Sequence, residues 1–375
     1  FGSMYLSQVR RTPGMRLTMV ADLDPARARG ALAHVGWTEA ELREVRFVDR
    51  GEELIASERV EVVIDATGSP AAGIAHVLAC CEHRKHVVMV NVEADALAGP
   101  LLAQRAREAG IVYSLAYGDQ PALICELVDW ARAAGFEVIA AGKGTKYLPA
   151  YHASTPDTVW QHYGLTPEEA RLGLTFPPCG VDDLARVLRP QADGGLLAHR
   201  GQVEVISSLE RDGRPVFRDL RWGVYVVFAG GSDYVERCFK EYGLVTDPSG
   251  RYSAMYKPYH LIGLELGISV ASVGLRGEAT GAPQAFSADV VATAKRDLTA
   301  GEMLDGEGGF TVYGKLRSAA ASLADGGLPL GLAHKVHLRR PVAAGQPVRW
   351  DDVEIDVSDR SVQFRREMER IAAQR

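Results

Sequence analysis

The first 118 residues alternate between short apolar runs and longer helix-like segments, and this alternation is the strongest constraint on the fold. The runs "VEVVID" and "HVVMVN" are nearly continuous in Val, Ile and Met, and helix-like segments follow them. Such strands are typical of a parallel sheet that helices cover on both faces. The pattern predicts an α/β fold whose doubly wound first domain spans residues 1–118.

The opening residues predict a helix, a tight turn and a strand. Apolar residues between Met4 and Val9 fall at helical spacing, Pro13-Gly14 ends the helix, and "MRLTMVADLDP" supplies a strand that ends at Asp22. Helix, turn, strand and acidic residue form the second half of a βαβ unit. We therefore expect a first strand and a glycine-rich turn ahead of this helix, so that the protein's own start lies before Phe1.

Composition excludes several classes of function. The chain has 375 residues, a formal net charge of -6 and a hydrophobic content of 47%. An acidic balance argues against a nucleic-acid partner, and no apolar run reaches the roughly 18 residues of a membrane span. Five scattered cysteines match neither a disulfide framework nor a zinc motif, so we expect a reducing, cytoplasmic compartment.

The sequence pattern changes after residue 118. One long helix, one strand and a Gly/Lys-rich loop come first, followed by the strand-like segments "GQVEVISSL", "PVFRDLRWGVYVVFAG" and "AMYKPYHLIGLELGISVASVGL". We predict a mixed α+β catalytic and oligomerisation domain over residues 119–284. Short strands and turns predict a small β-rich module over residues 285–375.

Polar or small residues end three successive strands of the first domain. Asp22 stands where a Rossmann domain places an acid on the adenosine ribose, although it could equally cap the helix that starts at Pro25. Arg27 could meet a 2′-phosphate, which leaves NAD and NADP both open. The turn Ala66-Thr67-Gly68 and the strand-end residue Asn91 could receive nicotinamide and ribose, the alternative being a plain strand-to-helix turn.

Lysines and carboxylates supply the candidate catalytic groups. Lys143 and Lys146 share a loop with two glycines, and their ammonium groups suit a carboxylate, a phosphate or a developing alkoxide, unless they are simply solvated. Asp119 and Gln120 lie at a strand–helix junction, where a helix cap is the alternative role. Glu93 and Asp119 could help to hold a divalent ion, although their spacing matches no metal motif.

A second set of candidates lies in "MYKPYHLIGLE". Lys257 and His260 stand there among apolar residues. His260 could act as an acid or base near neutral pH, and a buried, hydrogen-bonded histidine is the alternative.

The blocks "DATGSP", "VNVEAD", "YGDQPALICELVDW", "AGKGTKYLP" and "YHLIGLELGIS" resemble a known family. The sequence is similar to homoserine-dehydrogenase-like oxidoreductases with a C-terminal SAF domain, a group that includes enzymes like 1-deoxy-D-xylulose 5-phosphate reductoisomerase. The resemblance implies a Rossmann domain for NAD(P), with NADPH favoured, and a homo-oligomer. Relatives open with a Gly-x-Gly-x-Phe-Gly turn, which Phe1 and Gly2 would end. The tail "LAHKVHLRRPVAAGQPVRWDDVEI" looks like the SAF module.

The sequence departs from the family's motifs at several places. Asn91 is not followed by the lysine of homoserine dehydrogenases, and Lys146 replaces an asparagine of the Gly-Thr-x-Asn-Tyr loop. Both departures argue against homoserine as the substrate. The relatives' Asp-Gly-Thr-Lys helix is absent after "YGLTPEEA", either because residues are missing from this sequence or because they are deleted.

Residues and resemblance together predict an NAD(P)-dependent oxidoreductase or reductoisomerase for a small hydroxy or keto compound that carries a phosphate or carboxylate. Lys143 and Lys146 would polarise the carbonyl or hold the anion, and Asp119 or Glu93 would orient the substrate, with Mg or Mn as an optional aid. The alternatives are a homoserine dehydrogenase and a non-catalytic protein that binds a dinucleotide or sugar acid. Residues expected to contact the substrate are Gln120, Thr145, Tyr147, Lys257 and His260.

Overall fold

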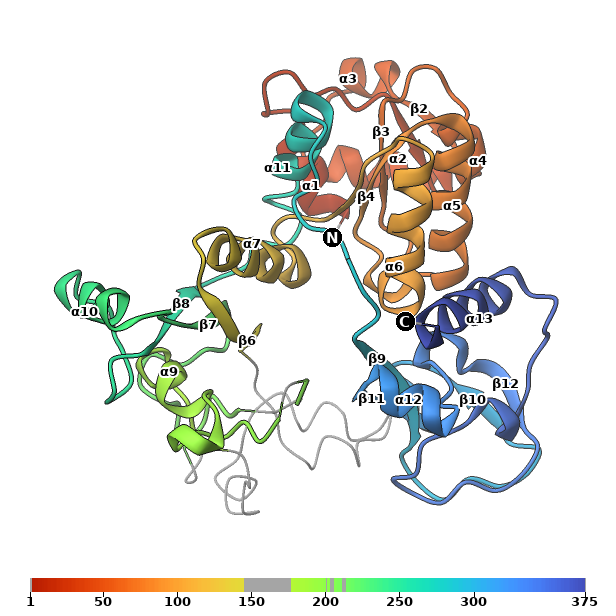
Figure 1. Ribbon diagram of the computed structural model, residues 1–375. Coiled ribbons are helices and arrows are strands. Elements are labelled where there is room, and N and C mark those ends of the chain that lie inside the picture. Colours follow the sequence, from red (N-terminus) through yellow and green to blue (C-terminus); the bar gives the residue numbers. More distant parts are fainter. Residues whose placement is uncertain (1, 145–176, 200, 203–205, 211–213, 375) are drawn as a thin grey trace. The chain divides into compact units, whose positions relative to one another are not determined.

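The computed structural model describes residues 2–144, 177–199, 201–202, 206–210 and 214–374 (Figure 1). The chain divides into two units. The first comprises Phe1–Leu123, Leu261–Phe286 and Asp356–Arg375, and the second comprises Ile124–His260 and Ser287–Ile355. The boundaries expected at residues 118 and 284 remain predictions.

The first unit has the predicted alternation of helices and parallel strands. Strands β1 and β2 pair with each other, and β3, β4 and β5 form a second parallel sheet in that order. The doubly wound α/β expectation is therefore confirmed. The elements are α1 (Gly2–Val9), β1 (Met19–Ala21), α2 (Pro25–His34), α3 (Glu39–Glu44), β2 (Arg46–Val48), α4 (Gly51–Ile55), β3 (Val62–Asp65), α5 (Pro70–His83), β4 (His86–Met89), α6 (Val92–Glu108) and β5 (Tyr113–Leu115).

Short polar side chains set where the helices of this unit begin. At the start of four helices, a side chain accepts a hydrogen bond from a backbone N–H of the first turn. These caps are Asp24 for α2, Thr38 for α3, Ser69 for α5 and Asn91 for α6. Such a bond satisfies a backbone donor that the helix itself cannot, which typically contributes about 1 kcal/mol. The caps fix how each helix leaves its strand.

Helices cover the β3–β4–β5 sheet on both faces. On one face, Tyr5 and Val9 of α1 pack in a cluster with Val88 of the sheet and with Leu266 and Val273. On the other face, α5 and α6 lie side by side (Figure 1).

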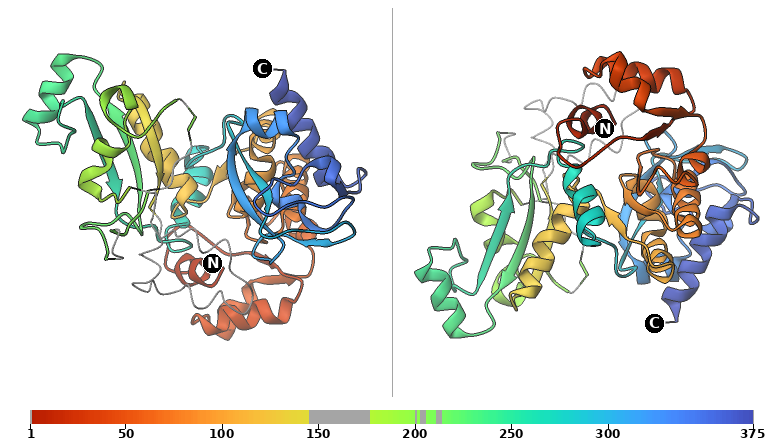
Figure 2. Two further views of the ribbon diagram at one scale, coloured as in Figure 1. Left: turned by 90° about the horizontal axis from the view of Figure 1, so that it is seen from below. Right: turned by 90° about the horizontal axis from the view of Figure 1, so that it is seen from above.

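The C-terminal helix α13 (Arg360–Ala373) packs beside α5 and α6 in every view (Figure 2). Its fully buried Arg365 donates from Nη1 to the carbonyl oxygen of Leu97 at 3.0 Å and lies 4.7 Å from the ring centroid of Phe286. This contact joins α13 to α6 and to the segment at Phe286.

The second unit contains an antiparallel sheet in the order β6–β7–β8. Its strands are β6 (Glu137–Lys143), β7 (Val224–Ala229) and β8 (Tyr252–Lys257), accompanied by α7 (Gln120–Ala133), α9 (Leu184–Val187) and α10 (Asp233–Glu241). Trp130 of α7 lies edge-on to Phe228 of β7, with ring centroids 5.3 Å apart, and Phe136 stacks on Phe228 at 5.0 Å. This aromatic cluster holds α7 on the sheet.

Two segments expected to form strands do not. The described part of 201–209 makes only isolated bridges, between Pro178 and Ser207 and between Leu209 and Pro215. Residues after His260 form α11 (Gly267–Ala271) and a π-helical turn, η5 (Ser272–Arg276). Leu266, Ser269 and Val273 are buried at a spacing of three to four residues, which is the period of a helix and not of a strand.

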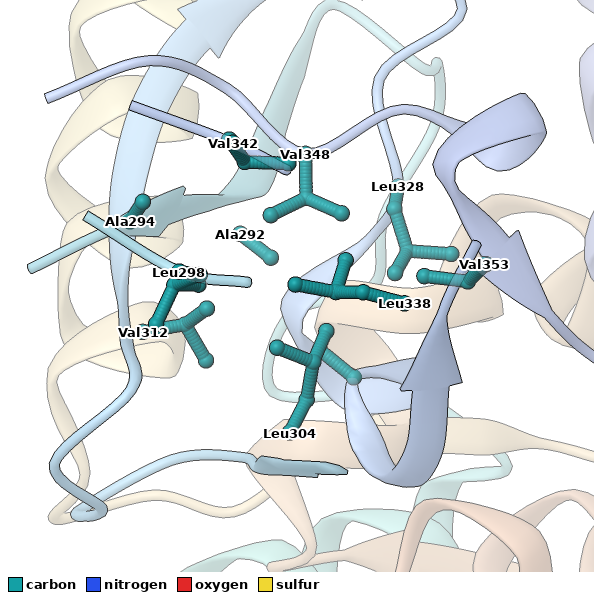
Figure 3. Packing of buried hydrophobic residues seen from close by; sticks show 11 residues of the cluster. Ala292, Ala294, Leu298, Leu304, Val312, Leu328, Leu338, Val342, Val348 and Val353 are labelled. Carbon is teal, nitrogen blue, oxygen red and sulfur yellow. The ribbon is translucent and has the colours of Figure 1, made fainter. Parts of the chain in front are cut away.

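The C-terminal module is β-rich, as predicted. Strands β9 (Ala288–Ala294) and β11 (Val312–Ser318) pair antiparallel, and β10 (Met303–Asp305), β12 (His334–Leu338) and β13 (Val353–Glu354) form a second sheet. Helix α12 (Ala319–Asp325) follows β11. Small and branched apolar side chains from both sheets fill the core (Figure 3). Within the described residues, none of the helices combines the length and apolarity that crossing a bilayer requires.

Candidate functional site

Four polar residues meet at the carboxyl ends of β3 and β4, and we call them the strand-end cluster: Asp65, Thr67, His76 and Asn91. Asp65 is the last residue of β3, Thr67 lies in the turn that follows, His76 lies on α5, and Asn91 caps α6. In parallel α/β sheets this edge is where ligands bind.

The carboxylate of Asp65 is at the centre of the cluster and its side chain is completely buried. Its Oδ2 lies 2.6 Å from Nδ1 of His76. Its Oδ1 accepts hydrogen bonds from the backbone N of Thr67 at 3.1 Å, from Thr67 Oγ1 at 2.9 Å and from Asn91 Nδ2 at 3.3 Å. One carboxylate thus ties together the turn after β3, the start of α6 and the second turn of α5.

Asn91 uses both ends of its side-chain amide inside the protein. Oδ1 accepts from the backbone N of Ala94 at 3.0 Å, and Nδ2 donates to the carbonyl oxygen of Ser69 at 2.8 Å and to Thr67 Oγ1 at 3.0 Å. A Cβ at Gly73 of α5 would lie only 2.7 Å from Asn91 Nδ2, so the glycine lets the two helices approach here. Asn91 is therefore buried beneath the turn Ala66–Gly68 and supports it through hydrogen bonds to Thr67 and Ser69.

The two charged groups of the cluster stabilise each other. Burial acts to raise the pKa of Asp65, but the hydrogen bonds from His76 and Thr67 outweigh it and hold that pKa below its ordinary value. The hydrogen bond to Asp65 raises the pKa of His76 above its ordinary value, against the opposing effect of burial. Below the raised pKa of His76, Asp65 and His76 are therefore an ion pair supported by neutral donors.

The turn above the cluster is open. Ala66, Thr67 and Gly68 are exposed although Asp65 is buried directly before them. Gly68 has φ of +67°, the left-handed region that glycine adopts readily, and a Cβ there would meet no atom within 4 Å. Exposed backbone over a rigid buried support is what a flat nicotinamide and its ribose need, so these residues fit that group.

Asp22 lies just beyond β1, at the equivalent edge of the smaller sheet. Its Oδ1 accepts from the backbone N of Asp24 at 2.9 Å and from Arg27 Nη2 at 2.7 Å. Burial acts to raise its pKa, but these hydrogen bonds hold the pKa below the ordinary value. The cap of α2 is Asp24, so Asp22 does not have the capping role that the sequence also allowed.

Asp119 and Gln120 lie at the start of α7, as expected. Asp119 is buried, and its Oδ1 accepts from the backbone N of Gln120 at 2.8 Å. The preceding Gly118 has φ of +91°, and a Cβ there would lie 2.8 Å from the carbonyl oxygen of Leu261. The turn is therefore fixed by close backbone contact with the segment after His260.

Lys143 and Lys257 share one row of the antiparallel sheet. Both are in register with Val224, the first residue of the central strand β7. Directly opposed residues of an antiparallel pair point to the same face, so both ammonium groups project from one face at one end of the sheet. Lys257 Nζ lies 3.9 Å from Glu126 Oε2, whereas Lys143 ends β6 and is exposed.

His260 is half-buried, and its Nδ1 lies 2.9 Å from the carbonyl oxygen of Trp222. A pocket of about 640 Å³ lies nearby along β8, with Asp182, Arg218 and Tyr256 among its lining residues. Of the predicted substrate-contacting residues that the structure describes, Gln120, Lys257 and His260, none lines that pocket.

Some of the residues predicted for the site lie outside the part of the chain that the structure describes. They are Phe1, Thr145, Lys146 and Tyr147. Gly2 is the first residue of α1.

Carboxylates on α6 do not form a metal centre in the described structure. Glu93 is in the first turn of α6. Asp95, two residues further in the same turn, accepts from Tyr113 Oη at 2.7 Å, and burial raises its pKa to about 6. Across the residues with described positions, no three His, Cys, Asp or Glu side chains gather closely enough to hold an ion.

Sequence reasoning missed His76 and the central position of Asp65. The small residues of "DATGSP" predict the turn, and the sequence analysis gives Asp65 no role of its own. His76 lies within the helical run "AAGIAHVLACC", where the apolar period gave no reason to single it out. A polar residue at the carboxyl end of an otherwise apolar strand was the available signal.

Three family models match successive parts of the chain. "Homoserine dehydrogenase, NAD binding domain" matches residues 2–115, and "Oxidoreductase DRL, catalytic domain" matches residues 118–165 and 161–266. "SAF domain" matches residues 289–354. These matches confirm the expected combination of domains. No curated protein matches the chain.

Several solved structures with detectable similarity are oxidoreductases of low identity. A biliverdin reductase from Synechocystis, in complex with biliverdin and NADP+, is 19% identical over 39% of this chain and 43% of its own, with a TM-score of 0.28. A 1-deoxy-D-xylulose 5-phosphate reductoisomerase from Zymomonas mobilis, in complex with NADPH, is 16% identical over 45% and 49%, with a TM-score of 0.31. An NAD binding oxidoreductase from Klebsiella pneumoniae is 17% identical over 70% and 63%, with a TM-score of 0.29. The chain spans about half the length of the first two.

Proposed function

We propose that this chain, which joins the NAD binding domain of homoserine dehydrogenases to the catalytic domain of oxidoreductase DRL and an SAF domain, acts as an NAD(P)-dependent oxidoreductase. The substrate would be a small hydroxy or keto compound that carries a phosphate or a carboxylate. The observation that carries the proposal is the open turn Ala66–Gly68 above the buried strand-end cluster, within the stretch that matches the NAD binding domain.

Each part of the first unit has a role in this proposal. When bound, the dinucleotide supplies or accepts the hydride. The turn Ala66–Gly68 offers backbone to the nicotinamide end, and the strand-end cluster holds that turn in place. Asp22 and Arg27 meet the adenosine ribose, and Gly2 lies at the helix end nearest the pyrophosphate in the family's arrangement.

Lys143 and Lys257 supply the positive charge for the substrate. Two cations on one face of the sheet suit a phosphate or carboxylate, and a cation near a carbonyl oxygen stabilises the charge that develops there during reduction. Lys146 remains, beside Lys143, a proposed catalytic lysine that polarises the carbonyl or holds the anion. The other proposed substrate contacts are Gln120, Thr145, Tyr147 and His260, and Asp119 or Glu93 is proposed to orient the substrate. We also propose a cytoplasmic homo-oligomer, as the resemblance implies.

A panel of substrates tests this function. We expect oxidation or reduction of the dinucleotide with at least one phosphorylated or carboxylated hydroxy or keto compound, assayed with and without Mg²⁺ or Mn²⁺. Conversion of 1-deoxy-D-xylulose 5-phosphate would assign the reductoisomerase version, and conversion of homoserine would assign the dehydrogenase alternative. Dinucleotide binding without turnover of any panel member would favour the non-catalytic alternative.

Substitutions in the Asp22–Arg27 pair are expected to change the relative affinity for NADH and NADPH. We expect Asp22→Ala to weaken NADH binding about ten-fold and to spare NADPH, because the ribose loses a charged hydrogen-bond acceptor. Arg27→Ala should weaken NADPH selectively, because its guanidinium can pair with the 2′-phosphate. Dissociation constants from fluorescence titration measure both effects, and Arg16→Ala, at an exposed arginine, is the control. Equal losses for NADH and NADPH in either variant would contradict these roles.

A further inference from the structure

His76 has no part in the hydride transfer proposed above, yet it makes the shortest contact of the strand-end cluster. Its Nδ1 lies 2.6 Å from Asp65 Oδ2, and its side chain is only 17% exposed. A carboxylate that already accepts three other hydrogen bonds can only accept here, so Nδ1 of His76 carries the proton that is shared.

The imidazole is held in a fixed position on its other side. A Cβ at Gly51, the first residue of α4, would lie 2.4 Å from His76 Nε2, so only glycine leaves room for the ring. The charged groups that face His76 are Asp65 from β3 and Glu52 from α4, and both favour the imidazolium form. Burial of the ring acts in the opposite direction and lowers the pKa of His76.

The effect of His76 reaches the turn through Asp65. Asp65 Oδ1 holds the backbone N and Oγ1 of Thr67, and Asn91 Nδ2 holds the carbonyl oxygen of Ser69 from the other side. If His76 loses the proton on Nε2, its Nδ1–H still donates to Asp65, but the buried carboxylate no longer has a positive charge beside it. The donors around it must then compensate, and the turn they define is the part that can move.

We propose that His76 is a positioning residue which, as an imidazolium, clamps Asp65 and thereby holds the turn Ala66–Gly68 in the conformation that receives the dinucleotide. This inference rests on the proposed function, because it assigns the turn to the cofactor. It makes dinucleotide affinity dependent on pH although no titrating group touches the dinucleotide at this turn.

The sign of that dependence follows from the direction of the shift. The pKa of His76 is raised above its ordinary value of 6.5, so the clamp is complete below that value and is lost as the pH rises through the raised pKa. Dinucleotide affinity should therefore fall measurably as the pH rises from below 6.5 through the raised pKa of His76.

The experiment compares the NADH dissociation constant of the full chain across this pH range in three proteins. His76→Asn keeps a neutral donor near Nδ1 and removes the charge, and His83→Asn changes an exposed histidine of the same helix. We expect wild type and His83→Asn to lose affinity with rising pH, and His76→Asn to bind more weakly at pH 6 with an almost flat profile. An NMR titration of the imidazole should show a pKa above 6.5 that disappears in His76→Asn.

Two outcomes would overturn the inference, and they are distinguishable. Parallel pH profiles for wild type and His76→Asn would show that His76 does not position the turn, while NADH binding itself would leave the proposed function standing. Absence of NADH and NADPH binding in the folded wild-type chain would remove the proposed function and this inference together.

Discussion

Replacing Asp65 by asparagine is expected to lower the free energy of unfolding of the first unit by about 3 kcal/mol or more and to abolish measurable dinucleotide binding. Removing one partner of a buried ion pair leaves the other uncompensated, which typically costs about 3–5 kcal/mol. Asparagine also presents an NH₂ group where Asp65 accepts from His76 or from Thr67, so one donor would face another donor. Denaturant unfolding and dinucleotide titration measure the two effects.

Asp49 provides the matched control for this substitution. It follows β2 at the corresponding edge of the smaller sheet, and it is exposed. Asp49→Asn should change the unfolding free energy by less than about 0.5 kcal/mol, as exposed substitutions usually do. If Asp65→Asn were as stable as Asp49→Asn and bound NADH normally, the strand-end cluster would not support the turn.

Replacing Lys143 by methionine is expected to reduce kcat about 10²- to 10³-fold with whichever panel substrate is converted. That is the usual loss when one preorganised group that stabilises developing charge is removed. Methionine keeps the length and apolar stem of the lysine, and Lys143 ends an exposed strand terminus, so the fold should be unaffected. Steady-state kinetics and the melting temperature together measure the effect.

The control for this prediction is Lys240→Met, at an exposed lysine on α10 of the same unit. It should leave kcat and KM unchanged. A rise in KM with constant kcat in Lys143→Met would show that Lys143 holds the substrate's anion and does not act on the transition state. Unchanged kinetics would remove Lys143 from the site.

The sequence predicted the first unit well because its signals are local. Continuous apolar runs identify β3 and β4, and Ser69-Pro70 and Asn91 mark the helix starts that follow them. Likewise, the position of Asp119 and Gln120 at a strand–helix junction could be predicted from neighbouring residues alone.

The strand-end cluster could not be predicted in the same way, because its contacts join residues far apart in sequence. Asn91 contacts Asp65 only because β3 and β4 are adjacent and parallel, and His76 contacts Asp65 only because α5 folds back over the sheet. The residues after His260 predict a strand because most of them are apolar. Their burial at Leu266, Ser269 and Val273 became visible only once packing against α1 was known.

The most direct test of the account is whether the turn Ala66–Gly68 receives the dinucleotide. We would titrate NADH and NADPH into the wild-type chain and into two variants, Ala66→Trp, which fills the space over the turn, and Ala56→Trp, which changes an exposed alanine after α4. The account predicts saturable binding to wild type and Ala56→Trp and none to Ala66→Trp, with all three proteins equally folded. Equal binding by Ala66→Trp and wild type, or no binding by the folded wild type, would contradict it.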